Sequence, residues 1–209
     1  MKQGVIFKLV VALVLIGCLG ASIPARAEEP LTCSLSVSPL KGDSTVKKSD
    51  SGKKKGGSSS GSSTTTFERN IKFKAVVSFH GPAPEKPLMK VWYIGLGDGG
   101  KEMIEVGHED RQIELNEKGR AEIELTSPTT KMIKKTTTTS GGRGSRGGCG
   151  GGSTKSTTTG ERVTGCVIQV FAGDQLMKSW VTDSRWSKAA RNPSFSFELI
   201  DPKSAAKKK

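Results

Sequence analysis

The segment FERNIKFKAVVSF, residues 67–79, decides the fold class, because its apolar side chains recur at every second position. One face carries six apolar residues among seven positions, and the other face carries one, Val76, among six. This alternation predicts a strand with one buried face. Thirteen residues make a long strand, so we expect a bulge or a bend near Lys74.

Similar short segments lie on both sides of this strand, and turn residues such as Gly97-Asp98-Gly99-Gly100 and Gly173-Asp174 separate them. One short helix is expected from Arg185 to Arg191, with Asp183 or Ser184 as its cap and Pro193 after its end. We expect about eight strands, drawn from residues 33–40, 67–79, 90–96, 101–106, 111–115, 120–126, 163–171, 175–182 and 194–200.

Short strands joined by hairpins, without alternating helices, predict an all-β sandwich of the immunoglobulin or fibronectin-III style. Tryptophan in such folds usually packs inside, so Trp92 and Trp180 are expected against the core and Trp186 is expected to anchor the helix. One shared core is expected to contain Phe73, Val77, Ile123, Ile168, Val170, Phe195 and Phe197.

Two tracts interrupt this pattern. Residues 41–66 and 129–160 are rich in Gly, Ser, Thr and Lys and contain almost nothing to bury, apart from a hint of a strand at Met132 and Ile133. Ordering a chain costs about 1–2 kcal/mol per residue, which such composition does not offset. We therefore expect both tracts to be disordered insertions in a single domain over residues 28–202, followed by a basic tail at 203–209.

The net charge of +13 is unevenly distributed. The N-terminal leader, the two tracts and the tail together carry +17, which leaves the remaining residues at −4. The sandwich is therefore expected to be mildly acidic, with the positive charge confined to segments outside it.

Residues 1–27 have the layout of a secretory signal peptide. Lys2 and Lys8 precede an apolar run, and Ala25-Arg26-Ala27 places small residues where a signal peptidase cleaves. A membrane-spanning helix needs about 20 apolar residues, so this run is too short to span. We expect a mature chain beginning at Glu28 that is periplasmic or secreted, without a transmembrane helix.

A second interpretation of the leader stays open. Leu15-Ile16-Gly17-Cys18 also fits a bacterial lipobox, in which Cys18 is acylated and becomes the first mature residue. The protein would then be a membrane-anchored lipoprotein.

Three cysteines remain after cleavage of the leader: Cys33, Cys149 and Cys166. An odd number in an oxidising compartment allows one disulfide and a free thiol, or an intermolecular bridge. A bond between Cys33 and Cys166 would join the first strand to a late one, and a bond between Cys149 and Cys166 would close a short loop. Three unpaired thiols, with Cys166 a small core residue, are the third possibility.

The sequence offers little catalytic chemistry. It contains no G-x-S-x-G elbow, P-loop or dinucleotide fingerprint, so we expect no enzyme activity and no cofactor. His80 and His108 lie near no cysteine in sequence, which argues against a zinc site. The alternative is a small hydrolase or redox protein that uses Cys149 or a convergent His80 and His108.

The basic tracts suggest a partner. Arg143 and Arg146 lie in a glycine-rich segment like those that bind nucleic acid, but no aromatic residue lies between them for stacking, and the leader points to export. Two alternatives stay open: the tracts are solvated insertions without a partner, or they bind an anionic envelope surface or another envelope protein rather than a specific nucleic acid. The expected contacts are Lys53, Lys54, Lys55, Arg143 and Arg146.

The closing segment from Val163 to Trp180, with the short helix and Pro193 after it, resembles uncharacterised secreted β-sandwich proteins of bacterial envelopes. The resemblance covers about the last 40 residues. It implies a fold and a compartment and assigns no site residues. The sequence thus predicts a non-enzymatic exported module with a binding or structural role.

Overall fold

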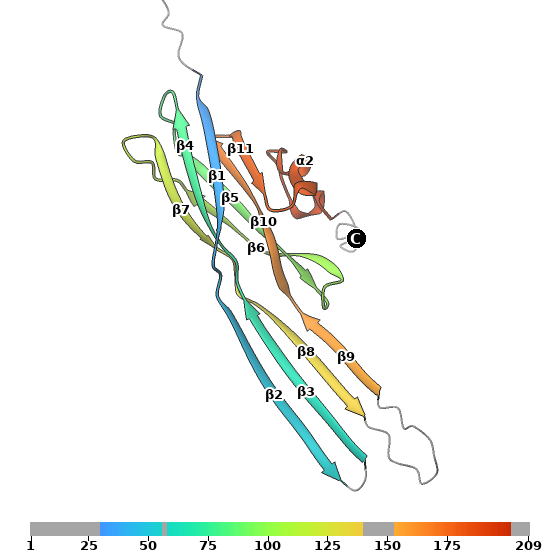
Figure 1. Ribbon diagram of the computed structural model, residues 1–209. Coiled ribbons are helices and arrows are strands. Elements are labelled where there is room, and N and C mark those ends of the chain that lie inside the picture. The colour runs from blue at the N-terminus through green and yellow to red at the C-terminus, as the bar shows by residue number, and fades with distance from the viewer. Residues whose placement is uncertain (1–29, 56–57, 140–152, 202–209) are drawn as a thin grey trace, which may run out of the picture. The chain divides into compact units, whose positions relative to one another are not determined.

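The computed structural model describes residues 30–55, 58–139 and 153–201 (Figure 1). The chain divides into two units, Met1–Pro30 and Leu31–Lys209, and every element below belongs to the second. The predicted signal peptide at 1–27, with Cys18, lies outside the described residues, as does the basic tail at 203–209. Within the described ranges, no helix is long and apolar enough to cross a membrane.

The described chain is mostly β, with eleven strands rather than the expected eight and one short α-helix. Asp183 caps the helical segment as predicted, since its side chain accepts a hydrogen bond from the Arg185 backbone N–H. The elements are β1 (Thr32–Leu40), β2 (Ser44–Lys55), β3 (Ser58–Arg69), β4 (Lys72–His80), β5 (Leu88–Gly97), β6 (Glu102–Gln112), β7 (Arg120–Thr126), β8 (Thr130–Thr139), β9 (Ser153–Gly160), β10 (Arg162–Ala172), β11 (Gln175–Val181), η1 (Ser184–Trp186), α2 (Ser187–Ala190) and η2 (Phe197–Leu199).

Two antiparallel sheets enclose the main core. The first has the strand order β1-β4-β7 and the second β11-β10-β5-β6. Alternate residues of β4 and β7 are buried against alternate residues of β5 and β10, as the period-two pattern predicts. Phe73, Val77, Ile123, Ile168 and Val170 lie in this cluster, as expected.

Phe195 and Phe197 do not join that core. They pack on the other face of the second sheet, in a separate cluster with Ile94, Val167 and Trp186. The expected strand at 194–200 is also wrong, because residues 197–199 form η2 and Leu199 is 47% exposed. Residues 165–171 of β10 are buried on both faces, so Cys166, Ile168 and Val170 belong to the main core and Val167 to the second cluster.

The segment 67–79 is two strands rather than one strand bent near Lys74. It breaks at Asn70 and Ile71, before the expected position at Lys74. The buried Asn70 binds Asp43 three times: its Oδ1 accepts from the Asp43 N–H at 2.7 Å, its Nδ2 donates to Oδ2 at 3.2 Å, and its own N–H donates to the Asp43 carbonyl at 3.1 Å. These bonds tie together the two chain segments that leave the first sheet.

The third sheet, β2-β3-β8-β9, occupies most of the two tracts that composition predicts to be disordered. That prediction is wrong for the described parts of residues 41–66 and 129–160, which pair continuously in antiparallel register. The positions of Lys53, Lys54 and Lys55 are at the end of β2, opposite Ser60, Ser59 and Ser58.

The connections explain why polar tracts form strands. Only one to three residues separate each third-sheet strand from a strand of the first two sheets, as β1 runs into β2, β3 into β4, β7 into β8 and β9 into β10. The folded sandwich therefore fixes the start and register of every third-sheet strand, which lowers the entropy cost of pairing. The β-branched threonines of β3, β8 and β9 also favour extended backbone.

Because the third sheet adds few apolar contacts, removing its outer part should leave the sandwich intact. We expect that replacing residues 48–65 and 134–158 with Asn-Gly turns, between the paired residues Lys47–Thr66 and Ile133–Thr159, changes the melting temperature by no more than about 4 °C. Thermal unfolding followed by circular dichroism measures this change. A much larger loss would mean that the third sheet stabilises the core.

Candidate functional site

The third sheet is strongly basic in sequence. Its four strands contain ten lysine or arginine residues and two acidic residues, Asp50 and Glu68. The lysine side chains described there are all exposed, and one of them, Lys47, lies 3.9 Å from Glu68. An exposed pair at this distance is weak, so the surface keeps a large positive excess.

This sheet has almost no apolar face. Val46, Phe67 and Met132 form one row across β2, β3 and β8 next to the sandwich, and Val46 is 53% exposed. Beyond that row and the neighbouring Ile133, the described side chains are hydroxyl groups, lysines and Asp50. A sheet that is stable alone normally needs a hydrophobic face, which these strands lack. Their side chains suit a surface exposed to water rather than a core.

Five residues were predicted to contact an anionic surface, and the structure locates the backbone of three of them. The backbone of Lys53, Lys54 and Lys55 belongs to β2, and their side chains lie outside the described residues. Arg143 and Arg146 lie outside the described ranges altogether. The lysines that the structure does place, which the sequence analysis did not single out, are Lys47, Lys48, Lys131, Lys134, Lys135 and Lys155.

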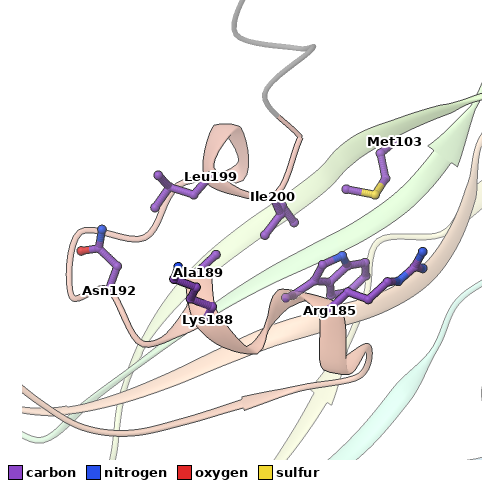
Figure 2. A pocket seen from close by; sticks show the side chains of 8 residues that line it. Met103, Arg185, Lys188, Ala189, Asn192, Leu199 and Ile200 are labelled. Carbon is purple, nitrogen blue, oxygen red and sulfur yellow. The ribbon is translucent and has the colours of Figure 1, made fainter.

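A second candidate site is a groove of about 500 Å³ beside the helical segment (Figure 2). Leu199, Ile200 and Met103 lie along one side of it, and the helix residues lie along the other. This volume suits a small ligand. Its lining is mainly apolar, with Arg185, Lys188 and Asn192 as the polar groups, and the described lining residues include no serine, threonine, cysteine, histidine or carboxylate.

Arg185 is already partnered at this groove. Its Nε donates to both carboxylate oxygens of Asp183 at 3.0 Å, and this bonding holds the pKa of the Asp183 carboxyl below its usual range. The arginine charge is therefore locally balanced, which leaves the groove with less net charge than the third sheet.

The two cysteines that the structure describes are free thiols. Cys33 pairs with Phe79 in the first sheet and Cys166 with Tyr93 in the second, so the Cys33–Cys166 disulfide, one of the three alternatives that the sequence left open, is not formed. Facing sheets pack about 10 Å apart, whereas a disulfide needs Cα atoms about 4.4–6.8 Å apart. Cys149, the other predicted partner of Cys166, lies outside the described residues.

The two histidines belong to different sheets. His80 ends β4 opposite Thr32, and His108 lies in β6 opposite Trp92. His108 Nδ1 is 3.0 Å from the Glu105 carboxylate, and its side chain is exposed. No group of three or more His, Cys, Asp or Glu residues in the described part of the chain is arranged to hold a metal ion.

Sequence reasoning missed a polar cluster between the sheets. The buried Tyr93 hydroxyl donates to Glu109 Oε1 at 2.7 Å, and Arg111 Nη2 donates to Glu109 Oε2 at 3.1 Å. Arg111 Nη1 also donates to the Glu124 carbonyl of β7 at 2.9 Å, which joins the second sheet to the first. The sequence gave no signal for this cluster, because residues 107–110 were expected to lie between two strands, 101–106 and 111–115, whereas they belong to β6.

The buried thiol gives a pH prediction. Burial raises the pKa of Cys166 to about 12, against 9.0 for an unperturbed thiol, and burial also raises the pKa of Tyr93. Above pH 9 the unfolded chain loses these protons before the folded chain does, so the free energy of unfolding should fall as pH rises from 9 to 12. The slope is at most about 1.4 kcal/mol per pH unit for each group.

Urea unfolding at pH 8, 9 and 10 measures this slope. The Cys166→Ala variant should show a shallower fall between pH 9 and 10 than the parent protein. An unchanged slope in the variant would show that Cys166 ionises equally in both states.

Comparison of the chain with protein-family models, curated proteins and solved structures found no match.

Proposed function

We propose that this protein is an exported, non-enzymatic β-sandwich module that binds an anionic surface of the cell envelope through its third sheet. The observation that carries the proposal is the ratio of ten basic to two acidic residues on four strands that have little apolar surface to bury. Exposed lysines near an anionic surface contribute about 1 kcal/mol each.

The strand order supports an immunoglobulin or fibronectin-III type of sandwich. The orders β1-β4-β7 and β11-β10-β5-β6 correspond to strands A-B-E and G-F-C-C′ of such domains. In this arrangement β2 and β3 are an insertion between A and B, and β8 and β9 are an insertion between E and F. The sandwich then acts as the support, and the inserted sheet as the binding element.

The proposal that the protein is exported is based on its N-terminal leader, in which an apolar run is followed by the cleavage motif Ala25-Arg26-Ala27. The intact mass of protein purified from its native envelope distinguishes cleavage before Glu28 from lipidation at Cys18, because the two products differ in length and in attached acyl chains.

Binding to anionic vesicles should fall steeply as salt is added, because exposed charges are screened within about 8–10 Å at physiological ionic strength. It should also fall when Lys53, Lys54, Lys55, Arg143 and Arg146 are replaced by serine, while the melting temperature stays unchanged. Neutral vesicles are the control. If neither salt nor these substitutions change binding, then the binding site lies on the sandwich and not on the third sheet.

A further inference from the structure

The register of the third sheet divides the lysines whose side chains the structure describes between two faces, four on one and two on the other. Directly paired residues of neighbouring strands share a face, and successive residues alternate. Lys47, Lys131, Lys135 and Lys155 fall on one face, which we call the lysine face, and Lys48 and Lys134 fall on the other. These side chains are exposed.

On the lysine face three of these residues form a diagonal line. Lys47 of β2 pairs with Thr66, Lys135 of β8 pairs with Thr64 two residues further along β3, and Lys155 of β9 pairs with Thr137 two residues further along β8. With strands about 4.8 Å apart and about 3.3 Å per residue, the Cα atoms are about 12 Å apart from Lys47 to Lys135 and about 8 Å apart from Lys135 to Lys155.

The positions between these lysines carry hydroxyl groups. On the same face lie Ser49, Thr64 and Thr157 in the row of Lys135, and Ser51, Ser62 and Thr137 in the row of Lys155. Each hydroxyl both donates and accepts a hydrogen bond. The row of Lys47 contains Thr66, Ile133 and Thr159, so one apolar side chain lies among these hydroxyl groups. The face therefore combines spaced positive charges with hydroxyl groups that can bond sugar hydroxyls.

The opposite face differs in arrangement. Lys48 and Lys134 share one row with Thr65 and Thr158, so they do not form a diagonal line. Each face carries one described carboxylate: Glu68 lies beside Lys131 at the sandwich end of the lysine face, 3.9 Å from Lys47, and Asp50 lies on the other face in the row beyond Lys48 and Lys134. The described lysines of both faces are exposed, but only those of the lysine face lie along a diagonal that a linear polyanion could follow.

We propose that the lysine face binds a linear acidic polysaccharide that lies diagonally across β2, β3, β8 and β9, its acidic groups near Lys47, Lys135 and Lys155 and its hydroxyls against the Ser and Thr side chains. This inference rests on the proposed function and specifies its ligand. A nucleic acid fits less well, because none of the described residues on this face is aromatic and available for base stacking.

The test uses the full chain and two probes at low salt. One probe is hyaluronan, a linear polymer with one carboxylate in every second sugar, and the other is vesicles of mixed phosphatidylglycerol and phosphatidylcholine. The variants K135T/K155T and K48T/K134T each replace one lysine of the central strand β8 and one lysine of an edge strand. They remove the same charge from opposite faces of one sheet, and threonine keeps the preference for extended backbone.

We expect K135T/K155T to weaken hyaluronan binding by about tenfold, which corresponds to two exposed contacts, and K48T/K134T to weaken it by no more than about twofold. The charge-preserving variant K135R/K155R should retain binding, which keeps the test valid if the threonine variant folds poorly.

The other outcomes separate the two proposals. Equal losses in the two threonine variants, or a preference for vesicles over hyaluronan, would overturn the polysaccharide site and leave the anionic-surface function in place. An absence of salt-sensitive binding to either probe would overturn both.

Discussion

Replacing Phe73 with alanine is expected to lower the free energy of unfolding by about 3–5 kcal/mol. Phe73 is 6% exposed in the core between the first two sheets, and its ring meets the edge of Trp180 with the centroids 5.8 Å apart. The substitution removes this contact and leaves a cavity that close-packed neighbours do not fill. Urea unfolding followed by tryptophan fluorescence measures the loss.

Phe67→Ala is the matched control. Phe67 precedes Phe73 on the same period-two pattern, yet it lies half-buried in the third sheet outside the core. The structure predicts that this variant loses much less stability than Phe73→Ala. Equal losses would mean that the pattern of residues 67–79 continues through one core, contrary to the break at Asn70.

Most of the sandwich was predictable because its signals are local. The alternation of Phe73, Ala75, Val77 and Phe79 identifies the buried face of β4 from adjacent residues alone. The same holds for Ala121, Ile123 and Leu125 of β7. The turns were predictable from adjacent residues as well. Gly99, Gly100 and Gly119 adopt positive φ, a conformation that glycine reaches without steric cost.

The third sheet was not predictable from composition, because its strands are determined by their neighbours in the chain. The stretch SSSGSSTTT in β3 has no periodic pattern and no apolar side chain. Its pairing depends on where β1, β4, β7 and β10 place the ends of the tracts, and that is tertiary information. The same limit applies to the candidate site, since the two lysine faces are defined only by the register across four strands.

The second cluster did leave a signal in the sequence. Residues 166–171 of β10, CVIQVF, are apolar at five of six positions, which indicates a strand buried on both faces rather than on one. A strand of this kind needs a cover on its second face, and the helical segment with Phe195 and Phe197 supplies it. The polar exception, Gln169, lies at 0% exposure under that cover.

Gln169 links the sheet to its cover. Its Nε2 donates to the carbonyl of Ala190 and to the carbonyl of Asn192, each at 2.8 Å. Its Oε1 is buried and accepts no hydrogen bond from the described protein groups. The side chain therefore binds the end of α2 to β10 through its amide N–H groups alone.

Gln169→Leu is therefore expected to lower the free energy of unfolding by about 2–4 kcal/mol, although leucine is apolar and similar in size. The substitution leaves the carbonyls of Ala190 and Asn192 without their hydrogen-bond donor, which costs about 1–3 kcal/mol for each buried group. It also removes the buried Oε1 that accepts no hydrogen bond, and this offsets part of the cost. The control is Gln175→Leu at an exposed position of β11, where the same exchange should change stability by less than about 0.5 kcal/mol. Equilibrium urea unfolding of the two variants makes the comparison. If Gln169→Leu is as stable as the control, then the apolar contacts of Trp186 and Phe197 hold the cover in place and the hydrogen bonds contribute nothing measurable.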